Sequence, residues 1–444
     1  MVYRKFLCLL IPAMLLSNLS FGQVKPTMLT QSTKAAIIDS LSEVLLSNYI
    51  FRDTAARMVS NIRGKLKAGA YDKLTAPADF AKYLTTDLRT IYNDKHLSIG
   101  YEAALQSDMQ HSSYIQQAAR QMQMAEQSRQ QNYGFSRAEI LSGNIGYLAI
   151  NGFFDLNDES KRAVNSAFDL LINSNTVIID LRLNGGGQAN MVNYISSLFF
   201  KDATHINDFY VRRTNQFHQN WTEPRSQSSV WHAIPIYILV SAYTASAAEE
   251  FAYDMQSQHR AVIVGEVTCG AAHPMQNAGI GNGFVANIPF ARPINPITKT
   301  DWESTGVRPN IAVRAGSALD AAIQNFYQHQ MSSTDTSTAK KARWMYFIYK
   351  AKMHPYKMDI HELKMFTGKY GDNEITMENG HLTYHTANGY ITGLSPISKT
   401  NFTLDASLDN REMVFSKDVR GQPYQMHLNF NGDLSAVYRN EGVR

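Results

Sequence analysis

Between residues 145 and 264, short apolar runs alternate with helix-forming segments, and this alternation limits the possible folds more than any other feature of the chain. The runs at residues 177–181 and 236–240 have the length and apolar composition of buried strands. Residues 160–172 have the composition of a helix. Strands that alternate with helices form a layered α/β core whose sheet is at least partly parallel. We therefore predict an α/β core over residues 140–330.

The regions on either side of this core have other patterns. Apolar residues in 23–102 recur at helical spacing with few Gly or Pro, which predicts a small helical domain. Residues 103–139 are rich in Gln and Met and are interpreted as a polar linker or insertion. Residues 331–359 begin with a Ser- and Thr-rich stretch that indicates a linker. Residues 360–444 contain short alternating segments separated by Asn-Gly turns, which predicts an all-β accessory domain.

The first 22 residues have the pattern of an export signal. Arg4 and Lys5 precede an apolar stretch at residues 6–16, and small residues follow at 17–22. The apolar stretch is too short to span a membrane. We therefore expect cleavage after residues 1–22 and an exported protein, periplasmic or secreted, without stable membrane insertion.

Charge and cysteine content narrow the possibilities further. The 42 basic and 38 acidic residues give a net charge of +4 and are spread along the chain, so no nucleic-acid partner is expected. Cleavage of the signal would remove Cys8 and leave Cys269 as the only cysteine, which excludes an intramolecular disulfide. The stability of the mature protein must then come from its core.

A serine between a predicted strand and a predicted helix is the first candidate for chemistry. Ser246 follows the apolar run at 236–240 and precedes the helix-forming segment at 247–258. The unpaired N–H groups and the dipole of a helix N-terminus favour a negative charge that develops there. Most serines at such a junction are helix caps, and the residue alone does not distinguish the two roles.

A serine hydroxyl becomes a nucleophile only beside an oriented base. His96, at the polar end of a predicted helix, and His273, after the strand that follows Ser246, are candidate bases, although His96 also fits a helix-terminal histidine. The Gly185–Gly187 turn ends a predicted strand, where glycine lets the backbone approach a ligand. It also fits a flexible turn. No Lys-Ser or Lys-Thr follows it, so a phosphate-binding loop is excluded.

Several ordered segments carry a family likeness. They are VIIDLRLNGGG at 177–187, TASAAEE at 244–250, AVIVGE at 261–266 with TCGAAHP at 268–274, and WESTGVRPN at 302–310. Together they resemble the tail-specific, or C-terminal-processing, serine peptidase family, in the branch that includes the tricorn core protease and interphotoreceptor retinoid-binding protein. The resemblance covers residues 30–325 and implies a layered α/β core of the ClpP/crotonase type.

The resemblance also implies roles for single residues. Ser246 corresponds to the nucleophile, and the backbone N–H groups of Ala247 and of Gly185 or Gly186 correspond to the oxyanion hole. The processing branch uses a Ser-Lys dyad, but its lysine position is Ala271 here, so the dyad is absent.

The tricorn-like branch uses a histidine base and a glutamate instead, and His96 and Glu303 match these two positions. Two positions depart from that pattern. Lys95 precedes the histidine where the tricorn core protease has a serine, and Asn310 replaces the usual aspartate. The change at Lys95 concerns how the residues of the catalytic network are connected by hydrogen bonds. The change at Asn310 is interpreted as structural. The chain also has no clear peptide-end-binding module between the helical domain and the core.

These observations predict an exported serine endopeptidase that cleaves peptide or protein substrates through an acyl-enzyme, without metal or organic cofactor. Two alternatives remain open. The first is a non-catalytic binding protein for apolar ligands on the same fold, and the second is an esterase-like hydrolase. The sequence gives no indication of an oligomeric state.

Overall fold

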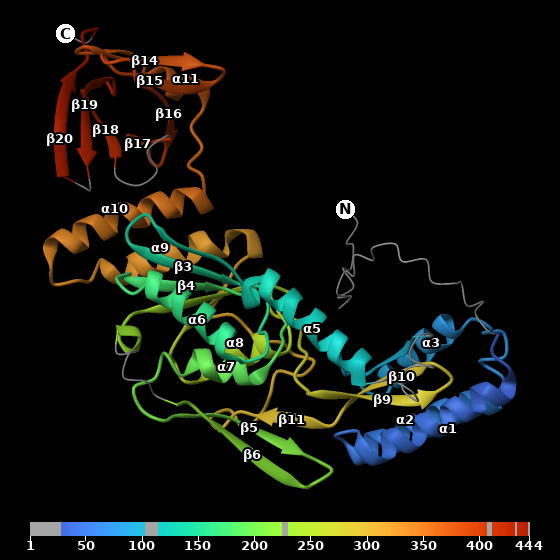
Figure 1. Cartoon of the computed structure of the whole chain (residues 1–444). Coiled ribbons are helices and arrows are strands. Elements are labelled where there is room, and N and C mark those ends of the chain that lie inside the picture. The colour runs from blue at the N-terminus through green and yellow to red at the C-terminus, as the bar shows by residue number, and fades with distance from the viewer. Residues whose placement is uncertain (1–27, 103–113, 224–229, 406–410, 431–432, 443–444) are drawn as a thin grey trace. The chain divides into compact units, whose positions relative to one another are not determined.

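A computed structural model describes most of the chain (Figure 1). The expected signal, residues 1–22, lies outside the described residues. The described residues are 28–102, 114–223, 230–405, 411–430 and 433–442.

The chain divides into two compact units. The first comprises residues 1–140 and 146–315, and the second comprises residues 141–145 and 316–444. All candidate site residues belong to the first unit.

Three N-terminal helices share an apolar core with a small antiparallel sheet. Buried side chains from both, such as Ile38, Leu84 and Phe284, form this core. The sheet joins a strand just after the helices to two strands from much later in the chain. The predicted helical region is therefore confirmed. The elements are α1 (Gln31–Asn48), α2 (Arg52–Lys67), α3 (Pro77–Arg89), β1 (Ser98–Tyr101), β10 (Phe284–Pro289) and β9 (Met275–Gly281), with strand order β1-β10-β9.

The predicted α/β core is also confirmed. Its six-stranded sheet has the order β12-β8-β7-β4-β3-β2, and β4, β7, β8 and β12 pair in parallel. Every residue of the central strands β4 and β7 is buried. The strands are β2 (Phe135–Leu141), β3 (Ile145–Ile150), β4 (Thr176–Asp180), β7 (Ile236–Val240), β8 (Val262–Gly265) and β12 (Ile311–Ala312).

Helices α6 (Asp158–Leu170), α7 (Ala189–Ser196) and α8 (Ala247–Ser257) pack on the core through buried residues such as Val164, Ile195 and Phe251. A separate antiparallel sheet has the order β11-β5-β6. Its strands are β5 (His205–Val211), β6 (Gln216–Trp221) and β11 (Ala291–Ile294).

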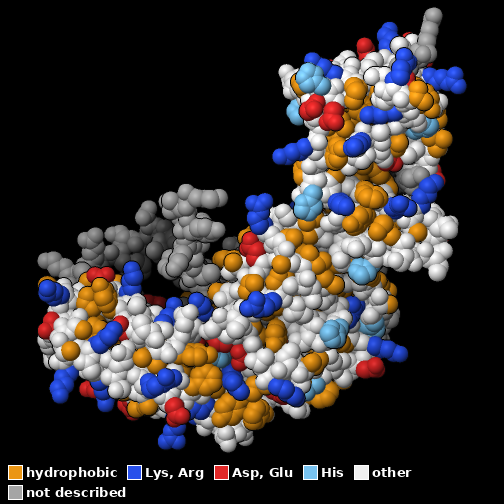
Figure 2. All heavy atoms as spheres, turned by 180° about the vertical axis from the view of Figure 1, so that it is seen from behind, with side chains coloured by type: hydrophobic (Ala, Val, Ile, Leu, Met, Phe, Trp, Pro, Cys, Tyr) orange, Lys and Arg blue, Asp and Glu red, His pale blue; other side chains and the backbone are white. Residues whose placement is uncertain are grey.

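The polar segment expected at 103–139 contains a helix, α5 (Tyr114–Gln130), followed by the short turn η1 (Asn132–Gly134) and strand β2. Among the described residues, no helix combines the length and hydropathy that a membrane span requires. Figure 2 shows basic and acidic side chains interspersed over one face of the molecule, without a continuous basic stripe on that face.

The second unit contains the predicted all-β domain. Eight antiparallel strands follow one another in chain order, and a bridge between Tyr370 and Asn440 nearly closes the sheet. The expected Asn-Gly turn is present, since Asn379 and Gly380 both have positive φ between two paired strands. The strands are β13 (Gly368–Tyr370), β14 (Asn373–Glu378), β15 (His381–His385), β16 (Ile391–Pro396), β17 (Asn401–Leu404), β18 (Arg411–Lys417), β19 (Pro423–Phe430) and β20 (Asp433–Arg439).

Residues 331–359, expected to be a linker, contain the 18-residue helix α10 (Thr336–Met353). Asp335 caps this helix, and Trp344, Met345, Ile348 and Tyr349 are buried on one face. The Ser- and Thr-rich start masked this apolar spacing in the sequence. The short turn η3 (Ala315–Ser317) lies at the boundary of the two units, and the second unit also contains α9 (Ala318–Gln330) and α11 (Ile360–Lys364).

Helix α8 buries two carboxyl groups one turn apart. Glu250 and Asp254 are 4% and 1% exposed. The Asn207 amide donates to Glu250 at 3.4 Å, and the Asn295 amide donates to Asp254 at 3.2 Å. Burial raises the pKa of Glu250 to about 8, and burial together with the charge of Glu250 raises the pKa of Asp254. The pair therefore holds a proton at neutral pH.

This proton makes the stability of the fold depend on pH. The unfolded Glu250 loses its proton above pH 4.5, whereas the folded group keeps it to about pH 8, so stability falls as pH rises through that interval. We expect the melting temperature of the Glu250→Gln variant to fall less than that of the wild type as pH rises. At pH 8 the variant should melt roughly 3 °C or more above the wild type, by the usual relation between stability and melting temperature. Melting temperatures from pH 4.5 to 8.5 measure this. Exposed Glu43→Gln is the control, and equal slopes in all three proteins would contradict the prediction.

Candidate active site

Ser246 stands between β7 and α8 in a strained backbone conformation. Its φ is 56° and its ψ is −124°, whereas a helix cap is ordinarily extended. A positive φ outside glycine costs about 1–3 kcal/mol and is concentrated at functional sites. Sharp strand-to-helix turns of this kind expose the nucleophile in other hydrolase folds. The side chain is half-buried, so it can meet a substrate.

The buried carboxylate of Glu249 holds this turn in place. It accepts hydrogen bonds from the N–H of Ser246 at 2.9 Å, of Gly270 at 2.7 Å and of Ala271 at 2.9 Å, and from the Thr268 hydroxyl at 2.5 Å. Burial raises the pKa of Glu249 to about 7 against the opposing effect of these bonds. Sequence reasoning missed Glu249, although its position three residues after Ser246 is that of a capping box.

The glycine turn predicted before the serine packs directly on it. A Cβ added to Gly186 would lie 2.7 Å from the Cβ of Ser246 and 3.2 Å from the N of Ala247, and the φ of Gly186 is 112°. Only glycine fits there. The turn is therefore a fixed wall of the site, not merely a flexible connection.

The N–H groups near Ser246 are not equally available. The N–H of Gly186 donates to the Asn184 side chain at 2.8 Å, so Gly186 contributes its missing side chain and not a free donor. Within the described ranges, no hydrogen bond uses the N–H of Gly185 or Ala247. Asn184 is wholly buried, and its carbonyl also accepts the N–H of Ala245 at 3.2 Å. Asn184, which sequence reasoning missed, thus ties the glycine turn to the serine segment.

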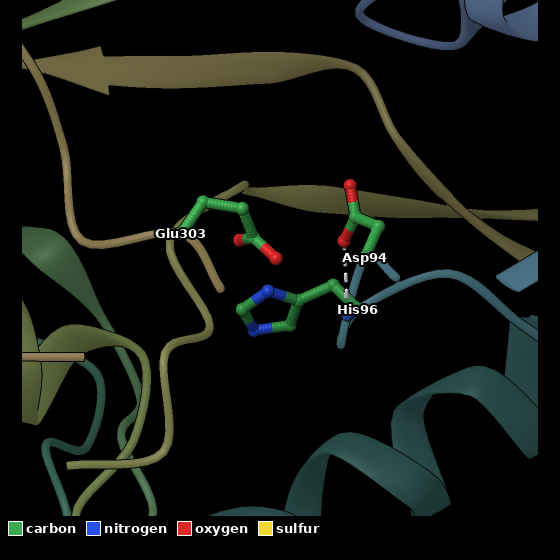
Figure 3. Close-up of side chains that lie close together, drawn as sticks. All are labelled: Asp94, His96 and Glu303. Carbon is green, nitrogen blue, oxygen red and sulfur yellow. Dashed lines mark hydrogen bonds between the residues drawn. The ribbon is translucent and has the colours of Figure 1, made fainter. Parts of the chain in front are cut away.

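His96 lies beside two carboxyl groups from distant parts of the chain (Figure 3). The backbone N–H of His96 donates to Asp94 at 3.1 Å, and the Glu303 carboxylate faces the imidazole ring. Its Nδ1 is buried and has no hydrogen-bond partner among the residues that the structure describes. Burial lowers the pKa of His96, although the charge of Asp94 opposes this. The imidazole is therefore neutral at neutral pH, which is the form that accepts a proton.

Glu303 is held by backbone donors. Its carboxylate accepts the N–H of Ala272 at 2.7 Å, of His273 at 3.3 Å and of Lys95 at 3.4 Å. Burial, together with the charge of Asp94, raises its pKa to about 7. Lys95 thus takes part through its main-chain N–H, which any residue except proline supplies at this position.

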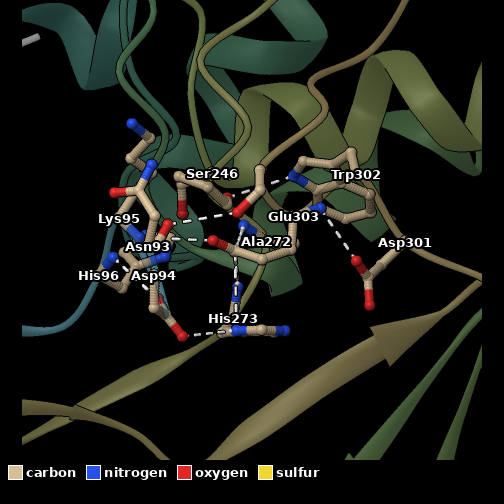
Figure 4. A network of polar contacts seen from close by, with 12 residues as sticks. Asn93, Asp94, Lys95, His96, Ser246, Ala272, His273, Asp301, Trp302 and Glu303 are labelled. Atoms are coloured by element: carbon tan, nitrogen blue, oxygen red, sulfur yellow. Dashed lines mark hydrogen bonds and ion pairs between the residues drawn. The ribbon is translucent and has the colours of Figure 1, made fainter. Parts of the chain in front are cut away.

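His273 contacts the carboxylates of Asp94 and Glu303. Its ring is buried, with Nδ1 2.7 Å from Asp94 and 3.6 Å from Glu303. Phe51 and Tyr92 contact the ring, and Figure 4 shows it pointing away from Ser246. Burial by itself lowers the pKa of His273, but the hydrogen bond and charge of Asp94 outweigh this, so the pKa is raised. Asp94 therefore favours the protonated form of His273, which sequence reasoning had considered only as a rival base.

Asp94, His96 and Glu303 present donor atoms that all lie within 4.8 Å of one another. A metal ion fits the two carboxylates poorly, because other donors already occupy their lone pairs, whereas Nδ1 of His96 has no partner among the described residues. Asp94 also accepts the Tyr49 hydroxyl at 3.2 Å, and Glu303 accepts three backbone N–H groups.

Ser246 and His96 lie in the same polar network (Figure 4). Among the described residues, no hydrogen bond joins the Ser246 hydroxyl to His96 or His273. Such bonds are often long before substrate binds.

Asn310, the other departure from the family pattern, has a structural role, since its side chain accepts the N–H of Ile263 at 2.8 Å.

Two family models match the first unit. The model of peptidase family S41 matches residues 144–313, and the model of the N-terminal domain of peptidase S41 in eukaryotic IRBP matches residues 26–133. Together they include every candidate residue of the site.

Two curated peptidases and one solved structure are similar to the chain. The tail-specific protease of Haemophilus influenzae is 27% identical over 200 residues, which is 44% of this chain and 24% of that protein. The chloroplastic carboxyl-terminal-processing peptidase 2 of Arabidopsis thaliana is 26% identical over 179 residues, or 38% and 32%. The chain thus spans about a quarter to a third of the length of these relatives. The tricorn protease structure shares 13% identity over 67% of this chain and 37% of that one, with a TM-score of 0.44.

The role of Glu249 can be tested by replacing it with Gln. The substitution keeps the size of the side chain but places an amide N–H group against backbone donors. We expect stability to fall by about 1–3 kcal/mol, because a buried donor loses its acceptor. Urea unfolding at pH 8, above the pKa of about 7, measures the change. Exposed Glu43→Gln is the matched control, and equal stability of the two variants would show that the carboxylate does not hold the turn.

Proposed function

The chain belongs to peptidase family S41, and from that premise we propose that it is a serine endopeptidase that cleaves polypeptides through an acyl-enzyme. Ser246 is the nucleophile, His96 is the base, and Glu303 orients and stabilises the base. The observation that carries the proposal is the strained Ser246 at the N-terminus of α8, packed against Gly186.

The reaction begins when His96 takes the proton of the Ser246 hydroxyl and the oxygen attacks the carbonyl carbon of a peptide bond. The ring nitrogen that faces away from Glu303 accepts this proton. The N–H groups of Ala247 and Gly185 stabilise the oxyanion, assisted by the helix dipole. The C–N bond then breaks, and His96 returns the proton to the leaving amine. Water, activated by the same histidine, hydrolyses the ester and restores Ser246.

The carboxyl groups support the charge that appears on His96. Once protonated, the ring lies beside Glu303 and Asp94, and the attraction favours the imidazolium. His273 keeps these two carboxylates together, since its protonated ring lies 2.7 Å from one and 3.6 Å from the other. His273 is therefore a positioning residue in this scheme.

His96 is preferred to His273 as the base for two reasons. Burial lowers the pKa of His96, so its ring is free to accept a proton, whereas Nδ1 of His273 is engaged with Asp94 at 2.7 Å and the pKa of His273 is raised. A lysine base of the processing type is not available at Ala271, whose N–H binds Glu249.

Substitutions at the proposed catalytic pair test this mechanism. We expect Ser246→Ala to abolish labelling by a fluorophosphonate probe and to reduce cleavage of denatured casein by at least about 10³-fold. His96→Asn removes the base and is expected to lower kcat by about 10²–10⁴-fold. Ser257→Ala, on the last turn of the same helix, is the control and keeps full activity.

Two other outcomes distinguish the alternatives. A folded protein that does not label, and that retains lipid on purification, contradicts catalysis and favours the apolar-ligand carrier. Labelling with rapid cleavage of a short-chain ester, but none of casein, favours the esterase.

We further propose that the protein is exported, on the basis of the charged, apolar and small residues in 1–22. Expressed from the full sequence, the secreted or periplasmic protein is expected to begin at or near Gln23, as N-terminal sequencing will show. Leu10→Arg interrupts the apolar stretch and should leave the chain unprocessed. A wild-type protein that keeps Met1 and remains in the cytosol would rule out export.

A further inference from the structure

A groove with a volume of 820 Å³ lies between helix α5 and the chain that follows β3. Residues of α5, the segment 153–157 and Gln188 line it. Its size suits a bound segment of several residues, because ligand pockets range from about 300 to 1,000 Å³. None of the catalytic roles proposed above uses it.

The groove lies close to the glycine turn of the proposed active site. Its wall residue Gln188 donates its N–H to the carbonyl of Phe153 at 2.8 Å, and Phe153 donates its N–H to the carbonyl of Gly186 at 2.9 Å. Gly186 is the residue that packs on Ser246. Only Gly187 separates Gln188 from Gly186, and consecutive Cα atoms are about 3.8 Å apart. A substrate held at Ser246 therefore reaches the groove within about two or three extended residues.

The lining combines exposed apolar side chains with acidic groups. Met122 and Met124 are 74% and 65% exposed on the Gln-rich helix α5. Methionine is flexible and polarisable, and it adapts to apolar partners of different shape.

The charged groups of the lining are mostly acidic. Glu126 is paired with Arg129 at 2.6 Å and Glu159 with Arg162 at 3.3 Å, so Asp155 is the lining carboxylate that forms no ion pair with a described residue. A segment rich in Asp or Glu would be repelled from such a lining.

We propose that this groove binds the substrate chain two or three residues from the cleaved bond and selects an apolar side chain with neutral or basic neighbours. The inference rests on the proposed peptidase function of Ser246. It gives the Gln- and Met-rich segment a role in substrate selection, with Met122 and Met124 as the residues that determine specificity.

Charge substitutions on α5 test the proposal. Met122→Glu and Met124→Glu place a carboxylate in the groove, and both side chains are exposed, so folding should be preserved. Gln123→Glu is the matched control, because it adds the same charge on the same helix at a residue that does not line the groove. The cleavage sites of a mixed peptide library are identified by mass spectrometry, and kcat/KM is measured for peptides with Leu, Lys or Glu at the selected position.

For the Leu peptides, we expect both Met variants to lose about 10-fold or more in kcat/KM, mainly through KM, a size typical of lost apolar contacts in a substrate pocket. Gln123→Glu and Met124→Leu should retain the wild-type preference. Fluorophosphonate labelling of Ser246 should be unchanged in every variant.

Two failures can be told apart. Unchanged preference in both Met variants, with Ser246 still labelled and casein still cleaved, overturns the groove while leaving the peptidase intact. A wild-type protein that neither labels nor cleaves overturns the peptidase function, and the groove proposal falls with it. A wild type that prefers acidic residues at the selected position also overturns the groove.

Discussion

Two buried glutamates hold one loop, and the candidate site depends on that loop. Glu249 binds the N–H groups of Gly270 and Ala271 together with the Thr268 hydroxyl, and Glu303 binds the N–H groups of Ala272 and His273. Hydrogen bonds from N–H to a carboxylate are stronger than neutral ones, and they offset part of the cost of burying the charge. Glu249 also binds the N–H of Ser246, so one side chain connects the loop to the strained serine.

Burial brings the ionisation of these groups close to neutral pH. The pKa of Glu249 and that of Glu303 are both raised to about 7, because burial disfavours their charged forms. Burial lowers the pKa of His96, although the charge of Asp94 opposes this. At His273 the hydrogen bond and the charge of Asp94 outweigh the effect of burial, so the pKa is raised. Two neighbouring histidines thus have pKa values shifted in opposite directions.

The sequence predicted the secondary structure around the site better than the hydrogen bonds within it. The strand before Ser246, the helix after it and the glycine turn all depend on local spacing and composition, and the parallel order of the central strands follows from their alternation with helices. Helix α10 was missed because the composition of its first turn resembles a linker. The sequence also offered the N–H of Gly186 as a donor for the oxyanion hole, but this N–H already donates to the Asn184 side chain.

By itself the sequence determined the fold class, the family and the position of Ser246 between a strand and a helix, because each is encoded in neighbouring residues. Only the tertiary structure decided how His96, His273 and Glu303 are arranged around Asp94. The contacts of Asp94 with His273 and of Lys95 with Glu303 join residues 179 and 208 positions apart. Such contacts, and the burial that shifts each pKa, depend on how distant segments pack, and no local pattern specifies that packing.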